Sequence, residues 1–171
     1  MPQDSDRRQG IKTLRMANAT LLPEVTRMIR EGHSVTLPLR GRSMRPFLED
    51  GRDKALLVSF TRQPRVGDPV LAEISAGTYV LHRIVRIDGD AVTLRGDGNI
   101  ATEHCTTADL RALAVGFYRK GRQQPDMTSG LKWRLYSWLW MRLLPVRRYL
   151  LFALHPHIPN RIKKTLKDEG G

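Results

Sequence analysis

A serine that could act as a nucleophile lies in the stretch "GRSMRP", residues 41 to 46, where Ser43 stands between two arginines. A serine hydroxyl is a poor nucleophile at neutral pH, so it needs a nearby base and donors for the developing oxyanion. Gly41 and Pro46 frame a bend that would hold Ser43 out of the preceding strand. Taken alone, this serine is weak evidence of catalysis, because turns are commonly built from Gly, Pro and Ser.

Three later stretches carry residues that could complete such a site. The first is "GD" at 67 and 68, just before the run "PVLAEI", and the second, "LHRIVRI", places His82 within an expected strand. The third, "LRGDGN", places Asp97 after the next expected strand. A neutral imidazole, whose ordinary pKa is about 6.5, can accept the serine proton and return it to the leaving amine. Ser43 and His82 are therefore the candidate pair.

In order and spacing, Ser-Met-x-Pro, Gly-Asp, His-Arg-Ile-Val and Gly-Asp-x-Asn resemble the S24/S26 serine peptidases, which include the signal peptidases and the self-cleaving LexA-type repressors. The resemblance covers about residues 35 to 118. Within that group the leader peptidases and LexA-like proteins use a lysine base, whereas the endoplasmic-reticulum type uses a histidine followed by Arg-Val or Arg-Ile. The stretch "LHRIVRI" matches the histidine class, and no lysine occurs between Lys54 and Lys120.

The same resemblance implies roles for residues around the pair. In the endoplasmic-reticulum type an acid follows the Gly-Asp stretch and orients the histidine. That position falls at Glu103, where the family prefers aspartate, and Asp97 is the alternative unless it is a structural turn residue. The Ser43 backbone N–H is expected to donate to the oxyanion. We also expect Gly41 and Met44 on the substrate side of the site. Gly41 would allow close approach of the substrate carbonyl.

We expect neither a metal nor a cofactor. His104 and Cys105 are adjacent, but no second pair lies at the spacing of zinc ligands, and only His104 beside it could activate the Cys105 thiol. A single cysteine fits a reducing compartment. No apolar segment reaches the roughly 18 residues of a spanning helix, and the first ten residues lack the apolar core of a secretory signal. These features predict a cytoplasmic protein, peripheral on the inner face of the membrane if it binds lipid.

The net charge of +12 is concentrated at the C-terminal end. Residues 119 to 171 carry 12 Lys+Arg against 3 Asp+Glu, whereas residues 1 to 118 carry 17 against 14. The basic part includes "LKWRLYSWLWMRLLPVRRYLLFALH", which holds all three tryptophans and which Pro145 should kink or break. Three roles stay open for it: contact of residues 131–154 with an anionic membrane surface, packing on the body, or binding of a partner protein.

The apolar pattern predicts a mainly β fold with helical ends. Helical spacing of Leu21, Val25 and Ile29 indicates one N-terminal helix within an arm that spans residues 1–33. Residues 34–119 form the expected β domain of about six strands, which the resemblance implies is like the signal peptidases and the LexA C-terminal domain. A linker at 120–130 and a basic, Trp-rich helical tail at 131–171 complete the expected organisation. The runs that predict the strands are "SVTLPLR", "ALLVSF", "DPVLAEI", "TYVLHRIVRI", "AVTLR" and "ALAVGFY".

The leading functional interpretation is a serine endopeptidase of the signal-peptidase type that cleaves a peptide or a precursor protein. A LexA-like self-cleaving regulator is less favoured, because only about 33 residues with one convincing helix precede the β domain and a helix-turn-helix needs more. We accordingly expect no sequence-specific binding of nucleic acid. A non-catalytic scaffold or binding protein with the same fold is the third interpretation.

Overall fold

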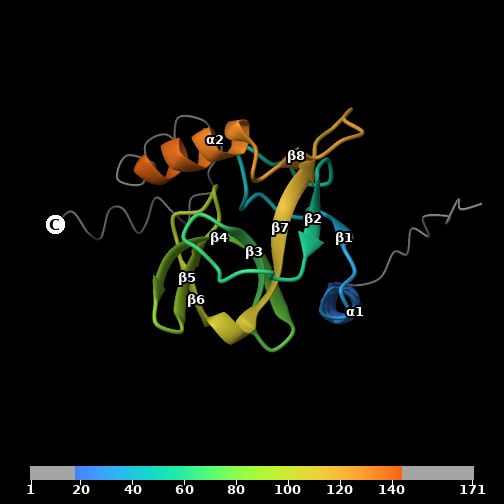
Figure 1. The fold of residues 1–171 in the computed structure, drawn as a ribbon, viewed down its shortest axis with the longest axis vertical. Coiled ribbons are helices and arrows are strands. Elements are labelled where there is room, and N and C mark those ends of the chain that lie inside the picture. The colour runs from blue at the N-terminus through green and yellow to red at the C-terminus, as the bar shows by residue number, and fades with distance from the viewer. Residues whose placement is uncertain (1–17, 144–171) are drawn as a thin grey trace, which may run out of the picture.

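A single antiparallel sheet of eight strands forms the centre of the molecule in the computed structural model, which describes residues 18–143 (Figure 1). The spatial order is β1-β2-β7-β3-β4-β5-β6, and β8 pairs with β7 on the edge opposite β2. The mainly β class predicted from the sequence is confirmed. The strands are β1 (Val35–Pro38), β2 (Lys54–Val58), β3 (Pro69–Ser75), β4 (Thr78–Asp88), β5 (Ala91–Arg95), β6 (Glu103–Thr106), β7 (Leu110–Tyr118) and β8 (Asp126–Met127).

Strand β7 joins the two halves of the sheet, because it pairs with β2 along one edge and with β3 along the other. Its sequence "LRALAVGFY" is an almost continuous apolar run, which is typical of a strand covered on both faces. The buried side chains accordingly form two clusters. One includes Val25, Met44 and Phe117, and the other includes Val70, Ile84 and Leu94. The candidate pair of Ser43 and His82 comes from segments that these clusters hold in place.

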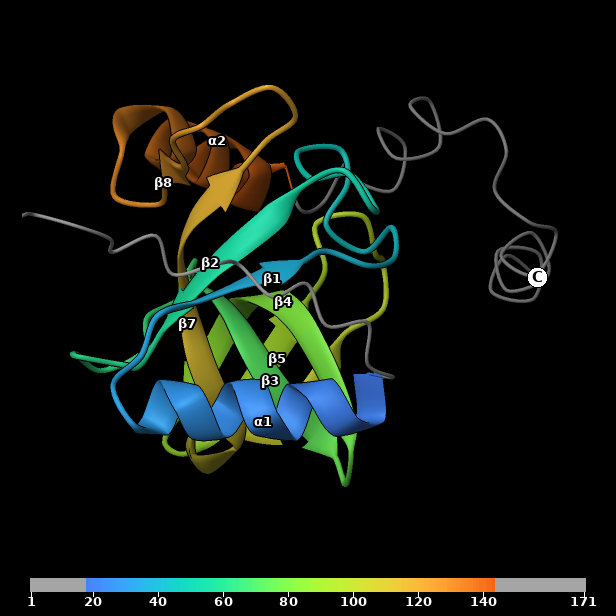
Figure 2. The same cartoon turned by 90° about the vertical axis from the view of Figure 1, so that its right-hand side faces the viewer.

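Two helices lie at opposite ends of the molecule (Figure 2). Helix α1 (Asn18–Arg30) buries Val25 and Ile29 against the sheet, at the helical spacing predicted from the sequence. Helix α2 (Leu131–Arg142) lies at the other end and buries Trp133 and Trp140. Neither helix, nor any other within residues 18–143, has the length and apolar character needed to cross a bilayer.

Two short strands and a 3₁₀ turn were not expected from the sequence. Strand β6 has the polar sequence "EHCT" and lies at the sheet edge, where alternate side chains are exposed. Its sequence therefore carries no apolar signal. The range 120–130, expected to be a linker, contains β8, and the 3₁₀ turn covers Thr107–Asp109. The sheet consequently has eight strands in place of about six.

The inner face of α2 packs on the β body, which was one of three roles considered for the C-terminal segment. The Trp133 ring stacks on Phe117 at a centroid distance of 4.8 Å and meets the edge of Phe47, also at 4.8 Å. The Arg83 guanidinium lies 4.9 Å from the Trp133 ring, close enough for a cation–π interaction. Helix α2 is thus part of the same packed unit as the sheet. Pro145 and the rest of the expected tail lie outside the described residues.

These contacts predict that Trp133→Ala lowers the free energy of unfolding by about 3 to 5 kcal/mol, the usual cost of removing a buried aromatic ring. Urea denaturation followed by circular dichroism measures the change. Trp138→Ala on the same helix is the matched control, since that side chain is 57% exposed and should cost about 0.5 kcal/mol or less. Equal effects of the two substitutions would contradict the docking of α2.

Candidate active site

Ser43 lies in a compact turn that follows β1. Within this turn the Arg45 N–H donates to the Arg42 carbonyl at 3.1 Å, and the Leu48 N–H donates to the Met44 carbonyl at 3.0 Å. The turn is tied to the loop after β5, because the Gly98 N–H donates to the Ser43 carbonyl at 2.6 Å. Ser43 itself stays partly exposed. The chain therefore bends out of the sheet at Ser43, as Gly41 and Pro46 predicted.

Ser43 packs directly on Gly96, the first residue after β5. A Cβ atom built on Gly96 would lie 2.5 Å from the Ser43 carbonyl oxygen and 2.9 Å from the Ser43 Cβ. Gly98 is similar, since a Cβ there would lie 2.6 Å from the Arg42 carbonyl oxygen. No real Cβ approaches backbone so closely, so both positions require glycine. The missing side chains are what allow the turn to rest on the end of β5.

His82 is buried in the middle of β4, with 3% of its surface exposed. Its Nδ1 lies 2.6 Å from Glu103 Oε2 on β6. A carboxylate can only accept a hydrogen bond, so we infer that Nδ1 carries the proton. The other ring nitrogen, Nε2, is then left with its lone pair, as a general base requires.

The register of the sheet places Ser43 over the face on which His82 lies. The pairing of β4 with β5 ends at Arg83 and Arg95, and from this register we infer that the next residues, His82 and Gly96, lie opposite each other. Opposite residues of an antiparallel pair point to the same face. The side of Gly96 that contacts Ser43 is therefore the side toward which the imidazole projects.

Glu103 reaches the same face from the neighbouring strand. It pairs with Leu94 across β5 and β6, and Leu94 precedes Gly96 by two residues and so shares its face. His82 and Glu103 thus meet from β4 and β6 on the face that Gly96 shares, whereas Ser43 and His82 form no hydrogen bond with each other in this structure. Of the two acids considered from the sequence, Glu103 is the one that contacts the imidazole.

Asp97 lies on the opposite face of the sheet and forms an ion pair with Arg83. Its carboxylate accepts two hydrogen bonds from Arg83, Nε to Oδ1 at 2.9 Å and Nη2 to Oδ2 at 2.7 Å, and both side chains are about 1% exposed. From α2 the Tyr136 hydroxyl donates to Asp97 Oδ2 at 3.0 Å, and Trp140 Nε1 donates to the Asp97 carbonyl at 3.1 Å. Asp97 therefore anchors the loop on which Ser43 rests. This is the structural role that was expected from the sequence as the alternative to orienting His82.

The Gly-Asp pair at 67 and 68 also serves structure. Gly67 has a φ of 98°, and its carbonyl accepts a hydrogen bond from Arg83 Nη1 at 2.9 Å. The Asp68 carboxylate accepts two hydrogen bonds of 2.8 Å from Arg62. These contacts hold the start of β3 against β4. Neither Gly67 nor Asp68 forms an interaction with the His82 imidazole.

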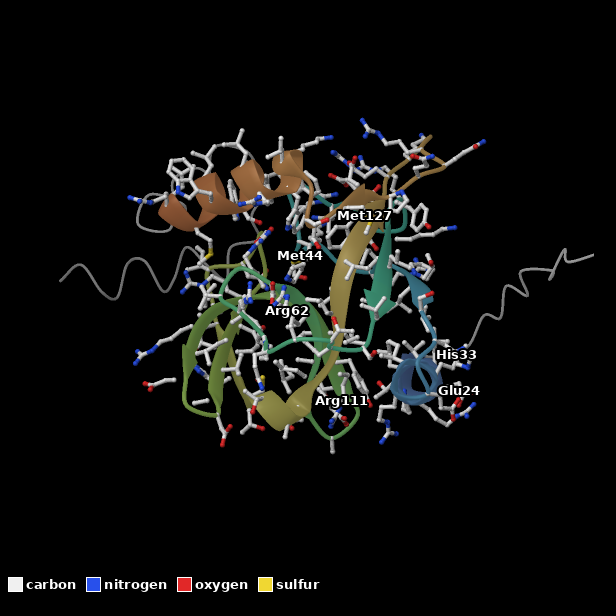
Figure 3. The ribbon with its side chains drawn as sticks, viewed as in Figure 1. Glu24, His33, Met44, Arg62, Arg111 and Met127 are labelled. Atoms are coloured by element: carbon white, nitrogen blue, oxygen red, sulfur yellow. The ribbon has the colours of Figure 1, made fainter. Side chains whose placement is uncertain are left out.

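The two residues expected on the substrate side are placed differently from each other. Gly41 is exposed, has a φ of 88°, and a Cβ built on it would meet nothing within 4 Å, so open space surrounds it. Its N–H donates to Asp50 Oδ1 at 3.1 Å. The Met44 side chain is instead buried in the core cluster that includes Val25 and Phe117. Figure 3 labels Met44 in the interior of the molecule, below α2. Met44 therefore positions the turn by packing.

Burial lowers the pKa of His82 below its ordinary value, although the nearby Glu103 charge and hydrogen bond act in the opposite direction. The imidazole is consequently neutral at pH 7, the form that can accept a proton. The pKa of the Cys105 thiol on β6 is shifted in the opposite direction. Burial, and to a smaller extent the Asp109 charge, raise it above its ordinary value. A raised pKa leaves little thiolate at neutral pH, so Cys105 lacks the activation of a nucleophilic cysteine.

Sequence reasoning missed Arg83 as an organiser of the site, together with its partners on α2. A signal was present, because successive residues of a strand face opposite sides and an arginine next to a buried histidine must find its own acid. Asp97 was available for that role. The contacts from Tyr136 and Trp140 had no comparable signal, since they depend on how α2 docks.

Comparison with known proteins gives no match, either to a protein-family model or to the sequence of a curated protein. The four sequence motifs and the geometry around His82 and Glu103 are therefore the only support for a function among the described residues.

The buried ion pair predicts that Asp97→Asn lowers the free energy of unfolding by about 3 to 5 kcal/mol, because it leaves the Arg83 charge buried without its partner. Urea denaturation at pH 7 measures this loss. Asp88→Asn is the matched control, since it also removes an arginine partner at 2.8 Å, but both side chains of that pair are 71% exposed. The control should cost at most about 1 kcal/mol. Similar losses in both variants would argue against an anchoring role for Asp97.

Proposed function

We propose that the protein is a serine endopeptidase of the signal-peptidase type, with Ser43 as nucleophile, His82 as general base and Glu103 as the residue that orients His82. The observation that carries this proposal is the buried hydrogen bond between His82 and Glu103 on the sheet face that supports the Ser43 turn. A buried imidazole with its Nδ1 proton engaged and its pKa lowered has the properties of a general base.

In the proposed reaction the Ser43 oxygen attacks the carbonyl carbon of the scissile peptide bond while His82 Nε2 takes the hydroxyl proton. The imidazolium that forms is stabilised by Glu103, and the Ser43 backbone N–H donates to the oxyanion. Collapse of the tetrahedral intermediate passes the proton to the leaving amine and leaves an acyl-serine. Water then attacks the ester, again with His82 as base, and releases the second peptide and free Ser43.

The exposed surroundings of Gly41 support a peptide or precursor protein as substrate, because an extended segment could approach the turn there without displacing protein atoms. A cytoplasmic location belongs to the same proposal, supported by the free, partly buried Cys105. Cell fractionation tests the location independently of the activity.

Ser43→Ala is expected to abolish cleavage and leave the fold intact, because the serine side chain is at the surface of a turn held by its backbone. Purified wild-type and variant proteins are incubated with cell extract, and new peptide termini are identified by mass spectrometry. Ser75→Ala, an exposed serine at the end of β3, is the matched control and should cleave as the wild type does. Termini that persist with Ser43→Ala would refute the assignment, and a wild type that generates none would favour the scaffold.

The cleavage rate should rise with pH and level off as His82 loses its proton, with a midpoint below 6.5 because burial lowers the pKa of His82. Once a substrate is identified, kcat/KM measured between pH 4 and pH 9 gives this midpoint. Glu103→Gln should move the midpoint to lower pH, since Glu103 acts to raise the pKa of His82, and should also reduce kcat. A midpoint near pH 9 would indicate a lysine base and contradict the role of His82.

A further inference from the structure

Helix α2 carries an apolar stripe on the face that points away from the body. Leu131, Leu135, Trp138 and Leu139 are exposed over 82%, 66%, 57% and 48% of their surfaces. Their spacing of four, three and one residues places them on one side of a helix with about 100° between residues. The inner face of the same helix buries Trp133 and Trp140, so the packing that fixes α2 leaves this stripe uncovered.

The stripe is not a general feature of the surface. The other large apolar side chains exposed within residues 18–143 are single residues on separate segments, namely Val66 before β3, Ile100 after β5 and Met127 on β8. Scattered apolar residues of that kind are normal, whereas a contiguous patch marks a contact surface. An exposed tryptophan among leucines is typical of a membrane interface, because the ring is apolar and its N–H can stay in contact with water.

Positive charge surrounds the stripe. Lys132, Arg134 and Arg142 lie on the exposed surface of α2, which has no acidic residue. Lys132 and two arginines share the Asp126 carboxylate, so one negative charge there faces three positive charges. The Arg142 guanidinium lies 5.5 Å from the Trp138 ring and therefore beside the stripe. The sequence that follows, residues 144–171, adds six Lys+Arg against two Asp+Glu.

We propose that this face of α2 docks on an anionic lipid bilayer, with Leu131, Leu135, Trp138 and Leu139 at the boundary of the acyl chains and the cations at the headgroups. The charge pattern favours lipid over a second copy of the chain. Self-association through this face would bring the same cations together. This proposal does not depend on peptidase activity.

The test is sedimentation of the full chain with phosphatidylcholine vesicles, with or without phosphatidylglycerol. The wild type should bind the vesicles that contain phosphatidylglycerol, and added salt should weaken the binding. Leu135→Gln/Trp138→Gln should reduce the partition coefficient by about tenfold or more, because two apolar side chains no longer enter the interface. Val66→Gln/Ile100→Gln is the matched control, with side chains of similar exposure, and should bind as the wild type does.

Tryptophan emission reports the depth of insertion directly. Binding should shift the emission to shorter wavelength in the wild type. Trp138→Phe should still sediment with vesicles but lose most of that shift, because Trp133 and Trp140 are already buried. Circular dichroism of each variant confirms that it is folded.

Four outcomes would overturn the proposal: no binding by the wild type, equal binding to neutral vesicles, full binding by Leu135→Gln/Trp138→Gln, or a dimer that this variant dissociates. Full binding by the double variant would place any lipid contact elsewhere in the chain. A dimer would assign the face to a second copy. Loss of vesicle binding by Ser43→Ala is not expected, so failure of the peptidase assignment and failure of this proposal remain distinguishable.

Discussion

The buried pair of Arg83 and Asp97 is the constraint on which the rest of the structure depends. Taking two charges out of water is costly, and the cost is offset only when their hydrogen bonds are satisfied in good geometry. Arg83 meets this requirement with Asp97, Gly67 and Ser137, and Asp97 gains contacts from Tyr136 and Trp140. One ion pair thereby joins β4, the loop after β5, the entry of β3 and helix α2.

The consequence reaches the candidate nucleophile through the backbone. Asp97 lies between Gly96, on which Ser43 packs, and Gly98, whose N–H binds the Ser43 carbonyl. Fixing Asp97 on one face of the sheet therefore fixes the surface that Ser43 meets on the other. The adjacent residues His82 and Arg83 divide the work in the same way, since the imidazole faces Glu103 and the guanidinium faces α2.

Sequence reasoning predicted the strands that carry apolar or β-branched runs, and it missed the polar edge strand β6, whose pairing depends on its neighbour β5. For the site, alternation along a strand could have separated the roles of the two acids, because Arg83 requires a partner on the face opposite His82. The contribution of α2 could not be predicted. Its inner aromatic residues and its outer apolar residues look alike in sequence, and only the docking against Phe47 and Phe117 tells them apart.

The two faces of α2 also separate two kinds of evolutionary change. Substitutions on the inner face alter the contacts that α2 makes with Asp97 and therefore the geometry around Ser43. The outer side chains of α2 form no interaction with the loop that carries Asp97. Selection can thus adjust the proposed bilayer-contacting surface, through Leu135 or Trp138, while the buried half of the helix stays constant. Deleting the helix, by contrast, would remove both the proposed lipid contact and the packing that holds Asp97, so only point substitutions can separate the two contributions.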